Sequence, residues 1–254
     1  MKRCFLLFVL FFFSLIHSQE LAYRFINFSE KDGVPDKFIY SISQDKKNRI
    51  WLGTQSGLYL FDGVKFNNVK SDKDIAGHQI SNILQNVFVD SSGEIWLSSI
   101  NALQILNPET KQFRSFEYND ENLNNIISAN ILNISEAEKA NVFVGTMKNY
   151  WFFINKKTGK TKHFIPQSQY LSDDSKLITK IIKAGNWYYA LSNNGIFKFN
   201  LNGVILPIFN FENGKPSKNS FEDGYFNAKI NSLILACGID GIATLNLQTN
   251  QFSY

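Results

Sequence analysis

Few side chains in this sequence are of the types that perform chemistry. Beyond its hydrophobic N-terminal segment, the chain has two histidines, His78 and His163, and one cysteine, Cys237. The histidines stand 85 residues apart, and neither has a cysteine or carboxylate nearby at metal-ligand spacing. Cys237 lies in an apolar run, which is typical of a buried, unreactive thiol. We therefore expect surface or packing roles for the histidines, and no metal or cofactor.

Two aspartates are the remaining candidates for catalysis. Asp45 and Asp90 each stand six residues before a tryptophan, Trp51 and Trp96. A pair of carboxylates can hydrolyse a glycosidic bond, but matching positions in two copies of a repeat predict two separate turns. The sequence also has no nucleophile elbow, phosphate-binding loop or dinucleotide-binding glycine motif. We expect no catalytic residue and no enzymatic activity.

The two tryptophans belong to a repeat that runs through most of the chain. The position of Trp51 recurs at intervals of 45, 47, 46 and 46 residues, at Trp96, Phe143, Tyr189 and Leu235. An Asp or Asn forms a second marker, at intervals of 45, 48, 45 and 46 residues, at Asp62, Asn107, Asn155, Asn200 and Asn246. Two markers that share one period predict five tandem units. These units lie near 39–69, 83–116, 129–164, 178–209 and 230–254.

Each unit is expected to form four short strands. In the first unit, the first strand ends near Gln44, the second covers 50–54, the third covers 58–61 and the fourth lies around 66–69. Turns rich in Asp, Asn and Gly separate them. Four strands per repeat predict an all-β fold, a β-propeller of about five four-stranded blades. Phe, Tyr and Trp make up 15% of the chain, as packed blades require. We therefore expect Trp51 and Trp96 to pack between blades rather than to bind a ligand.

The N-terminus has the three parts of a secretory signal peptide. Lys2 and Arg3 precede an apolar run of 13 residues, 4–16, and Ser18 is a small residue at the expected cleavage point. A membrane-spanning helix needs about 20 residues. We expect a signal peptide at 1–18 and a propeller at 19–254 that is exported and does not itself span a membrane. A single cysteine then allows no internal disulfide.

The charge of the exported part argues against a nucleic-acid partner. Without Lys2 and Arg3, 24 basic and 22 acidic side chains remain. No basic block is left that could neutralise a phosphate backbone.

The first unit carries a family resemblance. Residues 33–45 (GVPDKFIYSISQD), 49–54 (RIWLGT) and 57–58 (GL) resemble the two-component regulator propeller repeat. The match is good in the second unit and weak in the last three, where Phe143, Tyr189 and Leu235 replace tryptophan. The resemblance implies the periplasmic sensor region of a two-component regulator or hybrid histidine kinase of the Bacteroidetes type. It also implies a small ligand, such as an oligosaccharide.

Three functions therefore remain open. We expect the input half of a signalling protein, because these 254 residues contain no kinase or DNA-binding segment. A passive interaction scaffold is the second hypothesis. The third, a carbohydrate-active propeller enzyme, would need convergent carboxylates or a His–Tyr pair in the central channel. The sequence identifies no ligand-binding residue, because propeller sites combine side chains from different blades.

The sequence also predicts that the ring is open. Residues 23–28 match the fourth strand of a unit, and 250–254 read as another fourth strand. This makes six candidate fourth strands against five copies of the others, so a closed five-bladed ring would leave one unused. We expect an open arc of a larger ring, with seven blades as the resemblance implies, and a natural protein that continues past Tyr254 or is a truncated reading frame. Open blade faces should promote self-association.

Overall fold

Short apolar runs, several of them buried on both faces, form antiparallel strands throughout the described part of the chain. In this computed structural model the chain divides into two compact units, residues 1–34 and 35–254. The structure describes residues 25–70, 83–99, 102–115, 126, 130–148, 150–167, 176–193, 195–208 and 220–254, and the backbone of 211–212 and 215–216. The expected signal peptide at 1–18, His78 and residues 23 and 24 lie outside the described residues.

The described part of the first unit is short. Residues 25–29 have no regular secondary structure, and a 3-10 helix, η2 (Glu30–Asp32), follows them. The side chain of Ser29 and the carboxylate of Asp32 cap this turn reciprocally. The expectation of a strand at 23–28 is therefore wrong for its described part, since 25–28 form no strand. A single isolated apolar run has no ladder to satisfy its backbone unless a sheet edge pairs with it.

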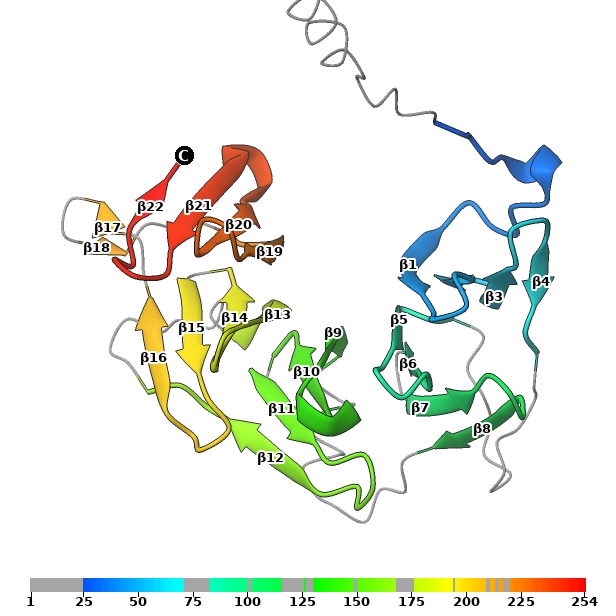
Figure 1. The fold of residues 1–254 in the computed structure, drawn as a ribbon, viewed down its shortest axis with the longest axis horizontal. Coiled ribbons are helices and arrows are strands. Elements are labelled where there is room, and N and C mark those ends of the chain that lie inside the picture. The colour runs from blue at the N-terminus through cyan, green and yellow to red at the C-terminus, as the bar shows by residue number, and fades with distance from the viewer. Residues whose placement is uncertain are drawn as a thin grey trace, which may run out of the picture. The chain divides into compact units, whose positions relative to one another are not determined.

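The second unit contains five four-stranded antiparallel sheets, each with its strands in chain order (Figure 1). The first sheet is β1 (Ile39–Gln44), β2 (Ile50–Thr54), β3 (Gly57–Phe61) and β4 (Phe66–Asn68). The second is β5 (Asn86–Val89), β6 (Ile95–Ser99), β7 (Ala102–Asn107) and β8 (Gln112–Ser115). The third is β9 (Ile131–Glu136), β10 (Val142–Thr146), β11 (Trp151–Ile154) and β12 (Thr161–Phe164).

The fourth sheet is β13 (Ile178–Ala184), β14 (Trp187–Ser192), β15 (Gly195–Phe199) and β16 (Ile205–Ile208). A short hairpin, β17 (Phe211–Glu212) and β18 (Lys215–Pro216), separates it from the fifth sheet. The fifth is β19 (Asp223–Asn227), β20 (Ser232–Ala236), β21 (Ile242–Asn246) and β22 (Phe252–Ser253). Two single 3-10 turns, η3 (Glu138–Ala140) and η5 (Gly238–Asp240), lie in connections. The predicted all-β blade architecture is confirmed.

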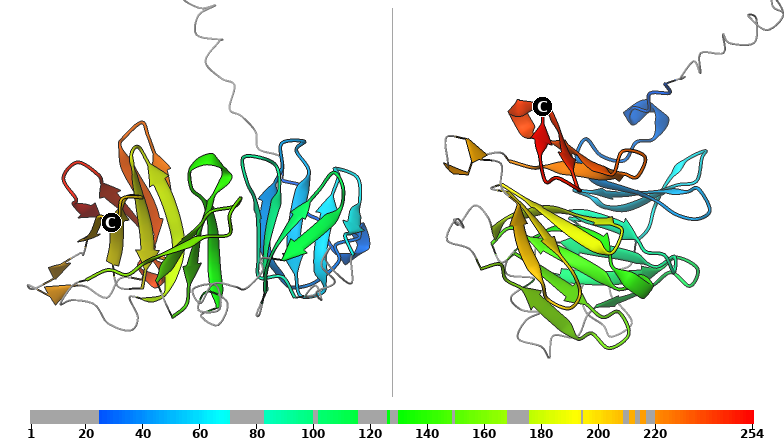
Figure 2. Two further views of the ribbon diagram at one scale, coloured as in Figure 1. Left: turned by 90° about the horizontal axis from the view of Figure 1, so that it is seen from below. Right: turned by 60° about the vertical axis from the view of Figure 1, so that its left-hand side comes forward.

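Within residues 35–254 the blades follow one another as an open arc. The first strands of successive sheets are neighbours, in the order β1, β5, β9, β13 and β19. The first and fifth sheets lie apart in Figure 1 and in the left view of Figure 2, so the ring does not close. The fifth sheet has its own fourth strand, β22, and borrows none from the described N-terminal residues. The predicted open arc is therefore confirmed.

Large apolar side chains fill the joints between sheets. Trp51, Trp96, Phe143 and Tyr189 are each at most 2% exposed, and each packs against the sheet that follows its own. Trp51, for example, shares a core with Val87 of the second sheet. The four residues occupy one register position, because each lies opposite the residue two before the Asp or Asn marker. Inter-blade packing of the tryptophans is thus confirmed.

In the fifth sheet the expected residue, Leu235, does not occupy this position. Ile234, not Leu235, lies opposite Thr244, two residues before Asn246. The hairpin of the fifth sheet spans three residues between Cys237 and Gly241, whereas that of the first sheet has two between Thr54 and Gly57. Because of this extra residue, counting a constant interval along the sequence points to Leu235, one residue past the equivalent position. Leu235 is buried against the fourth sheet, and Ile234 is only partly buried because no sheet covers it.

The last predicted unit also starts too late. Its first strand, β19, begins at Asp223, before the expected start near 230. The strand contains Gly224 and polar residues at both ends, so it lacks the apolar alternation that marks a half-buried strand.

Candidate functional site

The first strands of all five sheets line one concave cavity of about 620 Å³. Its walls are residues 41–43, 86–88, 133–136, 180–183 and 224–226. Because β1, β5, β9, β13 and β19 are edge strands, one side of each ladder faces this cavity. Residues from all five sheets are therefore available to a ligand at once.

One polar position recurs along these strands and links neighbouring sheets. Ser41 accepts the Val87 N–H at 3.0 Å, and the Asn86 side-chain amide donates to the Ile131 carbonyl at 3.1 Å. The Asn133 side-chain oxygen accepts the Ile181 N–H at 3.3 Å. We call this series of inter-sheet bonds the polar ladder. Its members Ser41, Asn86 and Asn133 hold the first strands of the first four sheets in register.

The fourth step of the polar ladder is an ion pair. Lys180 lies opposite Leu191 and Asp223 opposite Ala236, which are the register positions of Ser41 and its equivalents. The Lys180 Nζ lies 2.8 Å from the Asp223 Oδ1. Burial tends to raise the pKa of Asp223, but the hydrogen bonds from Lys180 and from the Gly224 N–H outweigh it. The pKa of Asp223 therefore lies below its ordinary value and the carboxylate is ionised.

Apolar and aromatic surface completes the cavity. Ile42 is 65% and Tyr225 57% exposed, and Phe88 and Phe226 also line the wall. Exposed aromatic rings beside amide and hydroxyl groups suit a polar ligand that has an apolar face. Among the described lining residues Glu136 is the only carboxylate and there is no histidine. This composition does not supply the carboxylate pair or His–Tyr pair that the enzyme hypothesis requires in the channel.

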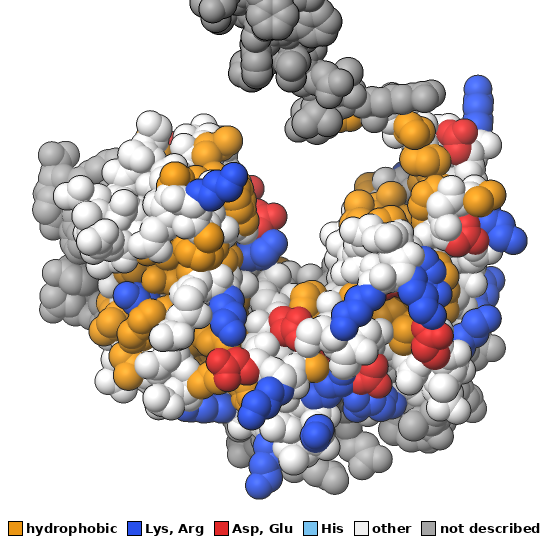
Figure 3. Space-filling view, in the orientation of Figure 1, with side chains coloured by type: hydrophobic (Ala, Val, Ile, Leu, Met, Phe, Trp, Pro, Cys, Tyr) orange, Lys and Arg blue, Asp and Glu red, His pale blue; other side chains and the backbone are white. Residues whose placement is uncertain are grey.

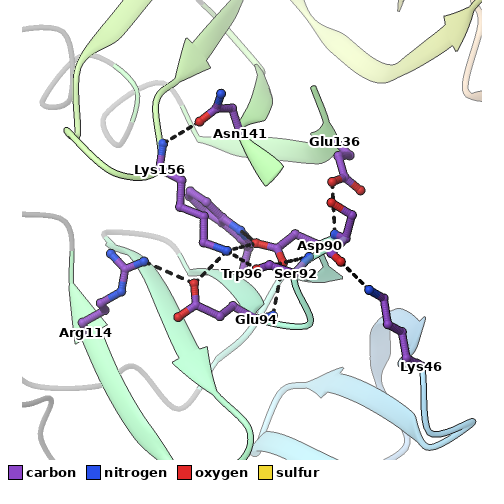
Figure 4. Close-up of polar contacts among 10 residues, drawn as sticks. Lys46, Asp90, Ser92, Glu94, Trp96, Arg114, Glu136, Asn141 and Lys156 are labelled. Carbon is purple, nitrogen blue, oxygen red and sulfur yellow. Dashed lines mark hydrogen bonds and ion pairs between the residues drawn. The ribbon is translucent and has the colours of Figure 1, made fainter. Parts of the chain in front are cut away.

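The predicted candidates Asp45 and Asp90 lie away from this cavity, in the turns between the first two strands of their sheets. Asp90 Oδ1 accepts the backbone N–H groups of Ser92 and Glu94, and its Oδ2 accepts Trp96 Nε1 at 2.9 Å (Figure 4). Asp45 bonds Trp51 in the same way. Each aspartate thus orders its own turn and orients the tryptophan that packs in the joint.

Asp90 also joins the second sheet to the third. Lys156, from the turn after β11, reaches the Asp90 carboxylate and lies 2.7 Å from Glu94 (Figure 4). The Asp90 side chain is fully buried. Burial tends to raise the pKa of Asp90, but hydrogen bonds from Lys156, Ser92 and Trp96 hold it below its ordinary value. The arrangement is a charged clamp between sheets.

The other residues singled out by the sequence take packing positions. The ring of His163, on β12, stacks on Phe152 with centroids 4.0 Å apart. Cys237 is 1% exposed, and burial raises the pKa of its thiol. No group of three or more His, Cys, Asp or Glu side chains that could hold a metal occurs in the described ranges. Of the helices in those ranges, none is long and apolar enough to cross a membrane.

Sequence comparison identifies one repeat. Residues 33–56 match the family described as two component regulator propeller. No curated protein matches the chain in sequence.

Structural comparison places the fold among propellers. The extracellular domain of BT3049 from B. thetaiotaomicron, assigned to a hybrid two component system, is 22% identical with a TM-score of 0.61, over 90% of this chain and 36% of that one. Virginiamycin B lyase from Staphylococcus aureus, in its inactive H270A form with quinupristin, is 13% identical with a TM-score of 0.66. The match covers 90% of this chain and 71% of the lyase chain. PorZ of Porphyromonas gingivalis, a surface component of the type-IX secretion system, is 15% identical with a TM-score of 0.63, over 84% and 33%.

At these identities the likeness shows the fold alone. The chain spans about a third of the length of the BT3049 extracellular domain and of the PorZ chain. The resemblance expected from residues 33–58 is confirmed: the first blade of this open propeller carries a two component regulator propeller repeat.

Proposed function

We propose that these five blades are part of the extracytoplasmic, ligand-sensing region of a two-component signalling protein, and that they are not an enzyme. The observation that carries this proposal is the two component regulator propeller repeat at 33–56, placed in the first of five blades whose first strands line one cavity. The extracellular domain of a protein assigned to a hybrid two component system shares this fold. Export to the periplasm, through the N-terminal segment at 1–18, belongs to the same proposal.

The cavity suits an oligosaccharide. Tyr225 offers an exposed ring, and the polar ladder offers hydroxyl, amide and ammonium groups beside it. Sugars present apolar C–H faces and hydroxyl edges, so they would use both kinds of surface. A passive scaffold would need no such combination at the centre of the arc.

Ligand-dependent thermal unfolding tests this proposal. A ligand that binds only the folded chain at about 100 times its dissociation constant stabilises it by about 2.7 kcal/mol, which raises the midpoint by about 5–10 °C for a domain of this size. We expect at least one member of a panel of neutral and acidic oligosaccharides to produce this rise. Mass spectrometry should recover that sugar intact.

A matched pair of variants locates the binding site. Tyr225→Ala should abolish the rise, while Tyr40→Ala should keep it, because Tyr40 is similarly exposed, at 50%, but does not line the cavity. A panel without any response would favour the scaffold hypothesis. Cleavage products would favour the enzyme.

A further inference from the structure

The ion pair at the fourth step of the polar ladder differs from the other steps in its chemistry. At the first three steps, a short neutral side chain bonds the backbone of the next sheet and is part-buried there. At the fourth step a long cation meets a carboxylate, and the side chains of Lys180 and Asp223 are 37% and 64% exposed. An exposed pair of this kind is held weakly and can exchange its partner with a solute.

The exchangeable group faces the cavity. Lys180 lines the cavity wall together with Lys183 of the same strand, whereas Asp223 lies outside the cavity lining. The one lining carboxylate, Glu136, accepts the Ser91 N–H at 3.0 Å through one of its oxygens. The wall therefore presents two cations and one anion, and Figure 3 shows charged side chains along this concave edge.

A ligand anion has a geometric reason to choose Lys180. Lys180 lines the cavity, whereas its counter-ion Asp223 belongs to the fifth sheet and is not part of this lining. A ligand carboxylate in the cavity therefore competes with Asp223 for the same ammonium group. Lys183 has partners of its own on the third and fourth sheets, because its Nζ lies 3.9 Å from Glu138 and over the ring of Tyr188.

We propose that the ligand of this cavity carries a carboxylate that takes the place of Asp223 at Lys180. This inference rests on the proposed sensing function and adds the ligand class to it. Replacement removes the side-chain link between β13 and β19, so binding and the joint between the fourth and fifth sheets become coupled. A ligand that binds better when this link is open shifts the joint toward the open state.

Calorimetric titration with citrate tests the proposal without knowledge of the natural ligand. The titration uses the whole chain after removal of the N-terminal segment, in chloride buffer of matched ionic strength. Lys180→Gln should weaken citrate binding by about tenfold, as expected for loss of a charged hydrogen bond. Asp223→Asn should tighten it by about two- to fivefold, since it removes a competitor from an exposed pair. Circular dichroism checks that each variant is folded.

A second exposed ion pair supplies the control. Lys47 and Glu109 lie 2.7 Å apart at the joint between the first and second sheets, are 59% and 63% exposed, and are outside this cavity. Lys47→Gln and Glu109→Gln should leave citrate binding unchanged. The proposal is overturned if the wild-type chain binds no citrate, if Lys180→Gln binds like wild type, or if Asp223→Asn does not bind more tightly. Failure of the sensing function itself would instead appear as a panel in which neutral sugars also give no thermal response.

Discussion

Replacing one residue at the repeated joint position separates covered blade faces from the open one. Trp96→Ala removes an indole that is 0% exposed and packs between the second and third sheets. Ile234→Ala changes the equivalent position of the fifth sheet, which no sheet covers. Both are truncations to alanine on the second strand of a blade, and they differ in the size of the side chain removed and in what lies against it.

The expected costs follow from burial. A buried tryptophan truncated to alanine loses transfer free energy and leaves a cavity, about 3–5 kcal/mol in total. Trp96→Ala also removes the Nε1 donor from the buried Asp90, so we expect the upper part of this range. Ile234 loses packing on one side only and leaves no closed cavity, so its truncation should cost about 1 kcal/mol.

Urea unfolding followed by tryptophan and backbone signals measures both changes in the free energy of unfolding. Phe143→Ala, at a covered joint, should group with Trp96→Ala. The reasoning fails if Trp96→Ala is neutral, which would mean an exposed ring, or if Ile234→Ala costs as much as Phe143→Ala, which would mean that the fifth face is covered.

Three further changes test the clamp, a close approach and the open faces. The pKa of Asp90 is lower in the folded chain than in the unfolded chain, so the stability that its carboxylate contributes is present above the unfolded pKa and is lost as the pH falls through the folded pKa. Asp90→Asn should therefore be less stable than wild type near pH 7. Below about pH 5 its free energy of unfolding should fall less than that of wild type, as melts at acid pH would record. Gly145→Ala should destabilise by about 2–3 kcal/mol in urea melts, because a Cβ there would lie 2.8 Å from the Ile178 carbonyl oxygen, and a neutral result would require the strand to move. Light scattering should detect self-association of wild type, and Ile242→Lys, at a position that is 68% exposed, should reduce it; a monodisperse wild-type monomer would contradict the proposed role of the open faces.

Much of the fold was predictable because the blades are local structures. Asp45 and Asp90 begin turns, because their carboxylates accept hydrogen bonds from nearby backbone N–H groups. Asn48 and Gly93 end these turns with φ values of 59° and 90°. Short apolar runs between such turns then mark the strands. These signals act over six or seven residues, so a single sequence contains them.

The errors have two origins, the length of one hairpin and a strand without an apolar pattern. One extra residue in the fifth hairpin moved the joint position from Leu235 to Ile234, and β19 lacks an apolar alternation that would have marked its start at Asp223. Loops tolerate insertions because they run over the surface. When equivalent positions are assigned by counting equal intervals, each inserted residue displaces the assignment by one. Strand pairing corrects it, since a shift of one residue would turn every side chain to the other face.

The repeat, the four-stranded unit and the residues that pack the covered joints follow from the sequence alone, because apolar spacing and turn chemistry can be read along one chain. The open arc was expected from a surplus strand at 23–28 that the described residues 25–28 do not form, so the arrangement of the sheets is what establishes it. The candidate site depends on how the sheets pack. Ser41, Asn86, Asn133 and Lys180 recur at intervals of 45, 47 and 47 residues, yet their residue types share no pattern that a sequence search would notice. Lys180 and Asp223 meet because the fourth and fifth sheets pack face to face and bring equal register positions together. A site built from one position in each of five sheets exists only after those sheets have stacked.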